Sequence, residues 1–133
     1  MPGPNFVLDK GYQPTGAVIQ FRAVTASTTN KEQCLQTATL GGRVLGICQD
    51  EVSATQATNG RVANIRVMGI SRCVAGSALA IDVPVGVDAS GRMVALAATT
   101  ANQLQVGITR TAAAAIGDYV DVQLTPAVSV SVP

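Results

Sequence analysis

The sequence contains no histidine and no tryptophan, and it has only two phenylalanines and two tyrosines. Without histidine, the chain has no imidazole general base, no Ser-His-Asp or Cys-His catalytic arrangement, and no histidine ligand for zinc. The aromatic platforms on which OB-fold and RRM proteins stack single-stranded nucleic acid are also missing. These absences exclude most enzyme classes and the common nucleic-acid-binding modules.

Charge is scarce and balanced, with nine basic residues against eight acidic ones and a formal net charge of +1. Surfaces that bind nucleic acid usually carry a basic patch, because each neutralised phosphate needs a Lys or Arg nearby. Here the arginines are scattered. No apolar run approaches the ~20 residues that span a bilayer, and the N-terminus lacks the apolar stretch of a signal peptide. We therefore expect neither a nucleic-acid partner nor a membrane partner.

The three cysteines, Cys34, Cys48 and Cys73, form no CxxC pair and lack the spacing of a metal knuckle. Cys73 follows Arg72, but neighbours on a strand point to opposite faces, so the guanidinium should not activate the thiol. We interpret all three as buried, reduced thiols of a chain made in a cytosol.

The remaining candidates for chemistry are equally weak. The aspartates lie mostly beside turns, where Asp is favoured for local hydrogen bonds, and none forms a convincing catalytic pair. Residues 86–93 imitate the glycine spacing of a P-loop but lack its Lys and Ser/Thr, so we interpret Asp88–Gly91 as a hairpin turn. The sequence predicts no catalytic residue, no cofactor and no metal site, and we do not expect an enzyme.

What the sequence does have is short runs of Val, Ile, Leu and Ala between turn-forming residues, and 47% of its residues are hydrophobic. Such runs indicate strands. We expect strands over residues 17–24, 32–39, 43–48, 63–73, 78–85, 92–97, 104–109 and 118–124. They predict an all-β fold, a compact β-sandwich or barrel of about eight to nine short strands. The best helical candidate is one turn over residues 112–115.

The chain divides into three expected segments. Residues 1–15 are rich in proline and should form an extended N-terminal arm that lies on its own domain or on a neighbour. Residues 16–126 form the β domain, and the alternating residues 127–133 form a C-terminal extension or edge strand. The candidate contacts to a neighbour are the apolar residues of the two terminal segments: Phe6, Val7, Leu8, Tyr12, Val128, Val130 and Val132.

An internal repeat runs through the β domain. Gly46-Ile47 is followed by a strand that begins after Gly60, and Gly107-Ile108 is followed by one that begins after Gly117. In register, residues 63, 65 and 67 match residues 120, 122 and 124 on one face of the strand. Chance similarity in a chain rich in Val and Ala is the competing explanation. If the repeat is real, two such units could face each other in a closed β domain.

Residues 16–125 resemble the small capsid decoration (cement) proteins of tailed bacteriophages. The residues that carry the resemblance are GRVLGI at 42–47, VGVDASGRMV at 85–94 and VGITRTAAAAIGDYVDVQL at 106–124. The polar stretch over residues 53–58 and the valine-rich tail after Pro126 depart from the family pattern and leave the docking mode open.

The resemblance implies a β-rich structural protein on the outer surface of a phage head, made in the bacterial cytoplasm. Its partners would be the major capsid protein, whose adjacent subunits it would cement, and further copies of itself in a trimer. One alternative is another self-assembling virion component, such as a head-fibre base or a coat subunit. A less favoured alternative is a ligand- or carbohydrate-binding β domain. Sugar sites usually need aromatic side chains, and this sequence has few of them.

Overall fold

The computed structural model describes residues 7–36, 43–96 and 103–130, with only the backbone for Gln103 and for residues 126–130. These residues form nine strands and one short helix, so the all-β prediction is confirmed. The elements are β1 (Leu8–Pro14), β2 (Ala23–Ala26), β3 (Gln33–Gln36), β4 (Gly46–Cys48), α1 (Ala54–Thr58), β5 (Ala63–Val74), β6 (Pro84–Val87), β7 (Met93–Ala95), β8 (Gln103–Thr109) and β9 (Tyr119–Val130).

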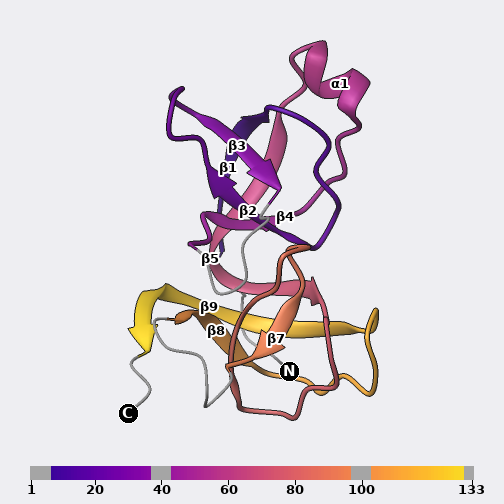
Figure 1. The fold of residues 1–133 in the computed structure, drawn as a ribbon, viewed down its shortest axis with the longest axis vertical. Coiled ribbons are helices and arrows are strands. Elements are labelled where there is room, and N and C mark those ends of the chain that lie inside the picture. The colour runs from indigo at the N-terminus through magenta and orange to yellow at the C-terminus, as the bar shows by residue number, and fades with distance from the viewer. Residues whose placement is uncertain (1–6, 37–42, 97–102, 131–133) are drawn as a thin grey trace.

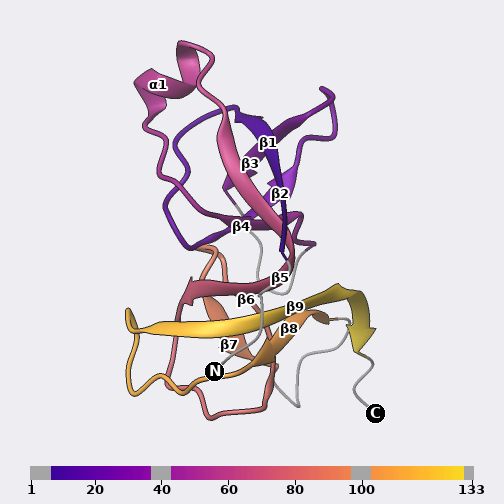
Figure 2. The same ribbon diagram turned by 180° about the vertical axis from the view of Figure 1, so that it is seen from behind.

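The strands form two small lobes, one above the other in Figure 1 and Figure 2. In lobe 1 (residues 8–67) the order β1-β3-β2-β4-β5 closes into a ring because β1 also pairs with β5. In lobe 2 (residues 69–124) the order is β5-β9-β8-β6-β7, and a parallel bridge from Ala75 to Met93 closes it. Closure leaves few free strand edges. The nine strands therefore form one mixed sheet that closes on itself within each lobe.

The long strand β5 belongs to both lobes. Its first half pairs with β1 and β4, and its second half, Gly69–Val74, pairs with β9. Between the halves the strand bends, as Figure 1 shows. Gly69 begins the second half, and its φ of 102° lies in the region that favours glycine. One strand therefore fixes how the two lobes sit against each other.

The internal repeat is confirmed, because equivalent strands of the two lobes pair in equivalent register. In lobe 1, β4 pairs with β5 through Ile47 and Arg66, and in lobe 2, β8 pairs with β9 through Ile108 and Gln123. The isolated bridges recur as well, Val18 with Val52 in lobe 1 and Leu79 with Ala113 in lobe 2. Residues with positive φ also occupy equivalent positions in the two lobes. The pairs are Phe21 and Asp82, Glu32 and Gly91, and Gly60 and Gly117.

A glycine permits a close approach of two strands in each lobe. A Cβ on Gly46 would press against the carbonyl oxygen of Arg66, and a Cβ on Gly107 would press against that of Gln123. Only glycine lets the two backbones come this close. The Gly-Ile pairs that reveal the repeat in the sequence are therefore features of the lobe geometry.

Two clusters of buried residues form the core. The cluster inside lobe 1 consists of Val18, Val24, Cys34, Cys48, Val52, Ala57, Ala63 and Ile65. The second contains residues of lobe 2 together with two from lobe 1: Ala23, Ile47, Cys73, Ala75, Leu79, Val85, Val87, Met93, Val106, Ala113, Val120 and Val122. Because Ala23 and Ile47 lie on the outer face of lobe 1, the second cluster also joins the lobes.

Two expected strands begin later than their sequences indicate. The run over residues 17–24 is strand only from Ala23, and the run over 78–85 only from Pro84. Phe21 and Asp82, which precede them, have φ angles of 64° and 62°. A left-handed residue breaks the alternation of a strand, so both runs start as loops.

The expected helical turn at residues 112–115 is wrong. That segment is a loop in which the backbone N–H groups of Ala114 and Ala115 donate to the carboxylate of Asp118. The helix lies instead at α1, where Ser53 and Gln56 form a capping box at the N-terminal end. The pattern Ser-x-x-Gln is a recognised helix-start signal, and it lies in the polar stretch that departs from the family pattern.

Both terminal segments contain strands. Leu8–Pro14, within the expected arm, form β1 and pair with β3 and β5. At the other end β9 continues through Pro126 to Val130 and pairs there with β8. The register shifts between Gln105 and Gly107, and Pro126 falls in this irregular stretch, the kind of position where proline is tolerated in a ladder.

Candidate docking surface

The three thiols are buried and reduced, as the sequence analysis expects. Cys34, Cys48 and Cys73 are all free and buried. Burial raises the pKa of Cys34 and of Cys48 to about 11, and burial together with the charge of Asp121 raises the pKa of Cys73. Arg72 points to the opposite, exposed face of β5. These cysteines are structural residues, because a thiolate is needed for a nucleophile.

We expect the native protein to react with a thiol reagent such as DTNB at pH 8 only as fast as it unfolds. Unfolding in urea should expose all three thiols at once. The pKa values of Cys34 and Cys48 lie near 11 in the folded protein, against 9.0 for a free thiol. As the pH rises, these two thiols therefore ionise in the unfolded chain before they ionise in the folded protein. The free energy of unfolding should therefore fall between about pH 9 and 11. Rapid reaction of the native protein would contradict this assignment.

Two aspartates, Asp88 and Asp9, make contacts that hold parts of the fold together. Asp88 accepts hydrogen bonds from the backbone of Ser90 and Arg92 and forms an ion pair with the Arg92 side chain at 2.9 Å. Asp9 forms an ion pair with Arg66 at 2.9 Å, and the hydrogen bond from Arg66 lowers the pKa of Asp9. Within the described ranges no three His, Cys, Asp or Glu residues are placed to hold a metal ion.

None of the described helical segments is long and apolar enough to cross a bilayer.

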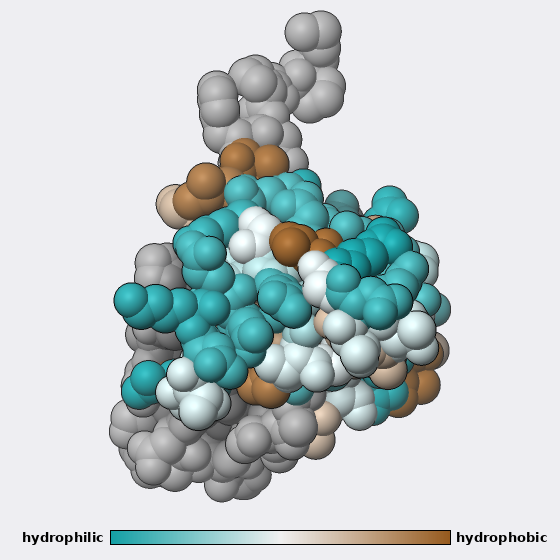
Figure 3. Space-filling model, turned by 90° about the horizontal axis from the view of Figure 1, so that it is seen from above, coloured by the Kyte–Doolittle hydropathy of each residue, from teal (hydrophilic) through white to brown (hydrophobic). Residues whose placement is uncertain are grey.

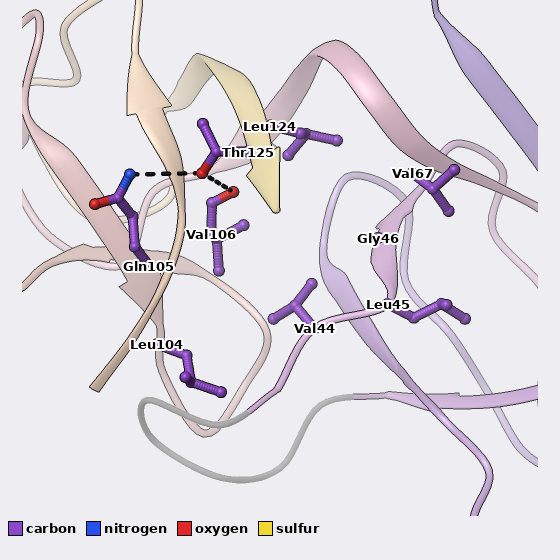
Figure 4. A pocket seen from close by; sticks show the side chains of 9 residues that line it. All are labelled: Val44, Leu45, Gly46, Val67, Leu104, Gln105, Val106, Leu124 and Thr125. Carbon is purple, nitrogen blue, oxygen red and sulfur yellow. Dashed lines mark hydrogen bonds between the residues drawn. The ribbon is translucent and has the colours of Figure 1, made fainter. Parts of the chain in front are cut away.

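A small pocket lies where the two lobes meet (Figure 4). It is lined by Val44, Leu45, Gly46, Val67, Leu104, Gln105, Val106, Leu124 and Thr125. Its polar side chains contact each other, with Gln105 donating to Thr125 and Thr125 to the Val106 carbonyl, both at 3.5 Å. A volume of about 30 Å³ is far below the ~300–1,000 Å³ of small-molecule sites. We interpret it as a packing gap of the lobe junction.

The predicted terminal contacts are only partly described. Val7 and Leu8 are exposed, and Leu8 lies directly opposite the exposed Met68 of β5. Tyr12 instead packs half-buried against the core of lobe 1, with the Lys10 ammonium 5.2 Å from its ring centre. Phe6 and Val132 lie outside the described residues, and Val128 and Val130 have only their backbone described, paired with β8.

The most distinctive exposed group is an aromatic–arginine cluster that the sequence analysis did not find. Arg72 of β5 lies over two rings, with its guanidinium carbon 5.4 Å from the centre of Tyr119 and 5.9 Å from that of Phe21. The rings meet edge to face, 5.6 Å apart at 84°. Arg72 is exposed and Tyr119 is 56% exposed. The three residues are distant in the sequence, so no local motif could reveal them.

The far end of lobe 1 has a different surface. Seen from above, in the view of Figure 3, the side of the molecule that carries α1 is covered mainly by hydrophilic residues, and hydrophobic ones occur only in small separate patches. Large apolar contacts are therefore not expected there, because binding sites usually centre on an apolar or aromatic patch.

No protein-family model matches the sequence, and no curated protein does. Among solved structures, the chain is similar to the crystal structure of the head fiber gp8.5 N base of bacteriophage phi29, with a TM-score of 0.67 and 13% sequence identity. The similarity covers 90% of this chain and 95% of that chain. At this identity it shows that the two share a fold. A head-fibre base is one of the alternatives to a decoration protein that the sequence leaves open.

Proposed function

We propose that this chain is a non-enzymatic virion protein that attaches to the outside of a phage head as the base of a head fibre. The observation that carries the proposal is the shared fold with the phi29 head-fibre base, which spans nearly the whole of both chains. The sequence supports it independently, because its resemblance is also to proteins of the phage head. The buried thiols and locally bonded carboxylates fit a protein built for assembly.

A decoration protein that cements adjacent major capsid subunits as a trimer is the second form of this proposal, favoured by the sequence motif at residues 106–124. Much of that motif has a role inside lobe 2, however. Gly107 permits the close approach to β9, Gly117 adopts a φ of 91°, and Asp118 caps the preceding loop. The motif therefore marks the lobe fold, which a fibre base and a decoration protein could share.

The test is to mix the purified chain with purified heads of its own phage, prepared without it, and to sediment the heads. We expect saturable binding to the heads, and a small oligomer that stays in solution when no heads are present. Electron microscopy of the bound heads then separates the two forms. Projections at discrete positions indicate a fibre base, and density that bridges neighbours across the lattice indicates a cement protein. Failure to bind, or assembly of shells by the chain alone, would contradict both.

We also propose that Val7 and Leu8 contact the shell. Deleting residues 1–15 is a poor test, because it removes β1 and opens the ring of lobe 1. The double variant Val7→Ser/Leu8→Ser should keep the fold and weaken head binding about tenfold, since two apolar side chains would lose burial. Ile116→Ser, which removes an exposed apolar side chain from lobe 2, is the control. Equal binding by the two variants would remove these residues from the interface.

A further inference from the structure

The cluster of Phe21, Arg72 and Tyr119 has the composition and geometry of a binding hot spot. We propose that it receives an acidic side chain, flanked by an apolar residue, from the shell protein to which the chain attaches. This inference rests on the proposed function and names the chemistry of its contact point. Four observations carry it: the positions at which the cluster occurs, the strain at Phe21, the charge of Arg72 and the apolar residues beside it.

The fold does not require an arginine and a tyrosine at positions 72 and 119. Lobe 1 builds the equivalent pair of strands, β1 against β5, in the same register as β5 against β9 in lobe 2. There the equivalent positions hold Gly11 and Val62. The repeat thus provides an internal control: the same backbone forms without a cation and without a ring, so these two side chains are available for binding.

Phe21 occupies a position at which the backbone itself is unfavourable for it. Its φ of 64° is repeated at the equivalent Asp82 of lobe 2, where φ is 62°. Aspartate tolerates this left-handed conformation, whereas for a bulky residue it is unfavourable. The backbone is held there by two hydrogen bonds, from Phe21 N–H to Cys48 and from Val74 N–H to the Phe21 carbonyl. In this conformation the Phe21 ring packs against Tyr119 and Arg72.

Arg72 carries a charge that no carboxylate neutralises at close range. Three other arginines each form an ion pair with an aspartate at 2.9 Å: Arg66, Arg92 and Arg110. Among the described residues, none forms such a pair with Arg72, not even Asp121, which lies opposite it on β9. The two rings hold the guanidinium, and its planar N–H groups can bind a carboxylate with two parallel hydrogen bonds. An acidic partner is the complement of this site.

Apolar residues extend from the cluster along β5. Ile70 is 36% exposed, and Met68 and its cross-strand neighbour Leu8 are 60% and 52% exposed. Arginine and tyrosine are enriched among the residues that dominate binding energy, and a surrounding of apolar contacts excludes water from them. We therefore expect the bound segment to place an apolar side chain next to its Asp or Glu.

The experiment measures the affinity of the full-length chain for purified heads of its own phage. Arg72→Ala and Tyr119→Ala should each weaken binding about 30-fold, as expected for hot-spot residues. Arg72→Lys should recover only part of the loss, because lysine keeps the charge but cannot form the planar two-bond contact. Arg61→Ala removes an exposed arginine beside α1 and is the matched control, which should bind like the wild type.

A second variant separates docking from folding. Phe21→Asn should fold with a similar unfolding midpoint, because relief of the strained φ offsets the lost ring packing, yet it should bind heads about tenfold more weakly. If Arg72→Ala bound heads as tightly as the wild type does, this inference would be overturned and the proposed function would stand. An equal loss in Arg61→Ala would also overturn the inference, because it would indicate a general charge effect. Failure of the wild type to bind would overturn the proposed function and this inference together.

Discussion

Replacing Gly46 or Gly107 by alanine is expected to lower the free energy of unfolding by about 3 kcal/mol or more. The new Cβ would strike the carbonyl oxygen of Arg66 or of Gln123 across the strand pair. Side chains beneath it leave no room for a shift, since the same Cβ would lie 2.8 Å from Ile65 or 2.7 Å from Val122. The strands would have to separate, and the pairing that defines each lobe would be lost.

The matched control for both variants is Gly16→Ala. A Cβ at Gly16 meets nothing within 4 Å, and its φ is not in the left-handed region. Alanine there should leave the protein as stable as before, or stabilise it by about 0.5 kcal/mol through the reduced freedom of the unfolded chain. Urea unfolding followed by circular dichroism measures all three. If Gly107→Ala unfolded at the same urea concentration as Gly16→Ala, the close approach would not constrain the fold.

Ile47→Ala is expected to lower the free energy of unfolding by about 3 kcal/mol, within the range for removing a buried isoleucine side chain. Ile47 is fully buried and belongs to the core cluster that joins the lobes, although its strand is part of lobe 1. The cavity would therefore open at the junction. Because β5 is also shared, we expect a single cooperative transition in the variant as in the wild type.

The repeat again supplies the control. Ile108 occupies the equivalent position in lobe 2 but is only half-buried, because within the described residues no third lobe covers that face. Ile108→Ala should lower the free energy of unfolding by only about 1 kcal/mol. Calorimetry of the two variants checks both the magnitudes and the cooperativity. Equal losses, or two separate transitions, would show that Ile47 does not couple the lobes.

Several features of this fold could be predicted from the sequence because they depend on neighbouring residues. Alternation of apolar and polar side chains located most strands, including the buried face of β5 and β9 at Ile65 and Val122. The turn at residues 88–91 follows from its Asp and Gly. Turn residues and strand alternation act over a few positions, so a single sequence displays them.

Other features have only a weak local signal in the sequence. The capping box of Ser53 and Gln56 marks the start of α1, but a helix of five residues is too short to show a hydrophobic period. The repeat visible in the sequence begins at Gly46 and Gly107, and only the structure extends it upstream to Phe21 and Asp82, which share a left-handed φ. The cluster of Phe21, Arg72 and Tyr119 therefore left no local signal in the sequence.

By itself, the sequence determined that this protein is an all-β chain with an internal repeat. Only the tertiary structure decided that the repeat forms two closed rings on one shared strand, with Ile47 of the first buried against the second. It alone brought Phe21, Arg72 and Tyr119 together. The physical reason is that pairing between distant strands depends on the closure of whole rings, and neither local propensity nor alternation encodes which strands will meet.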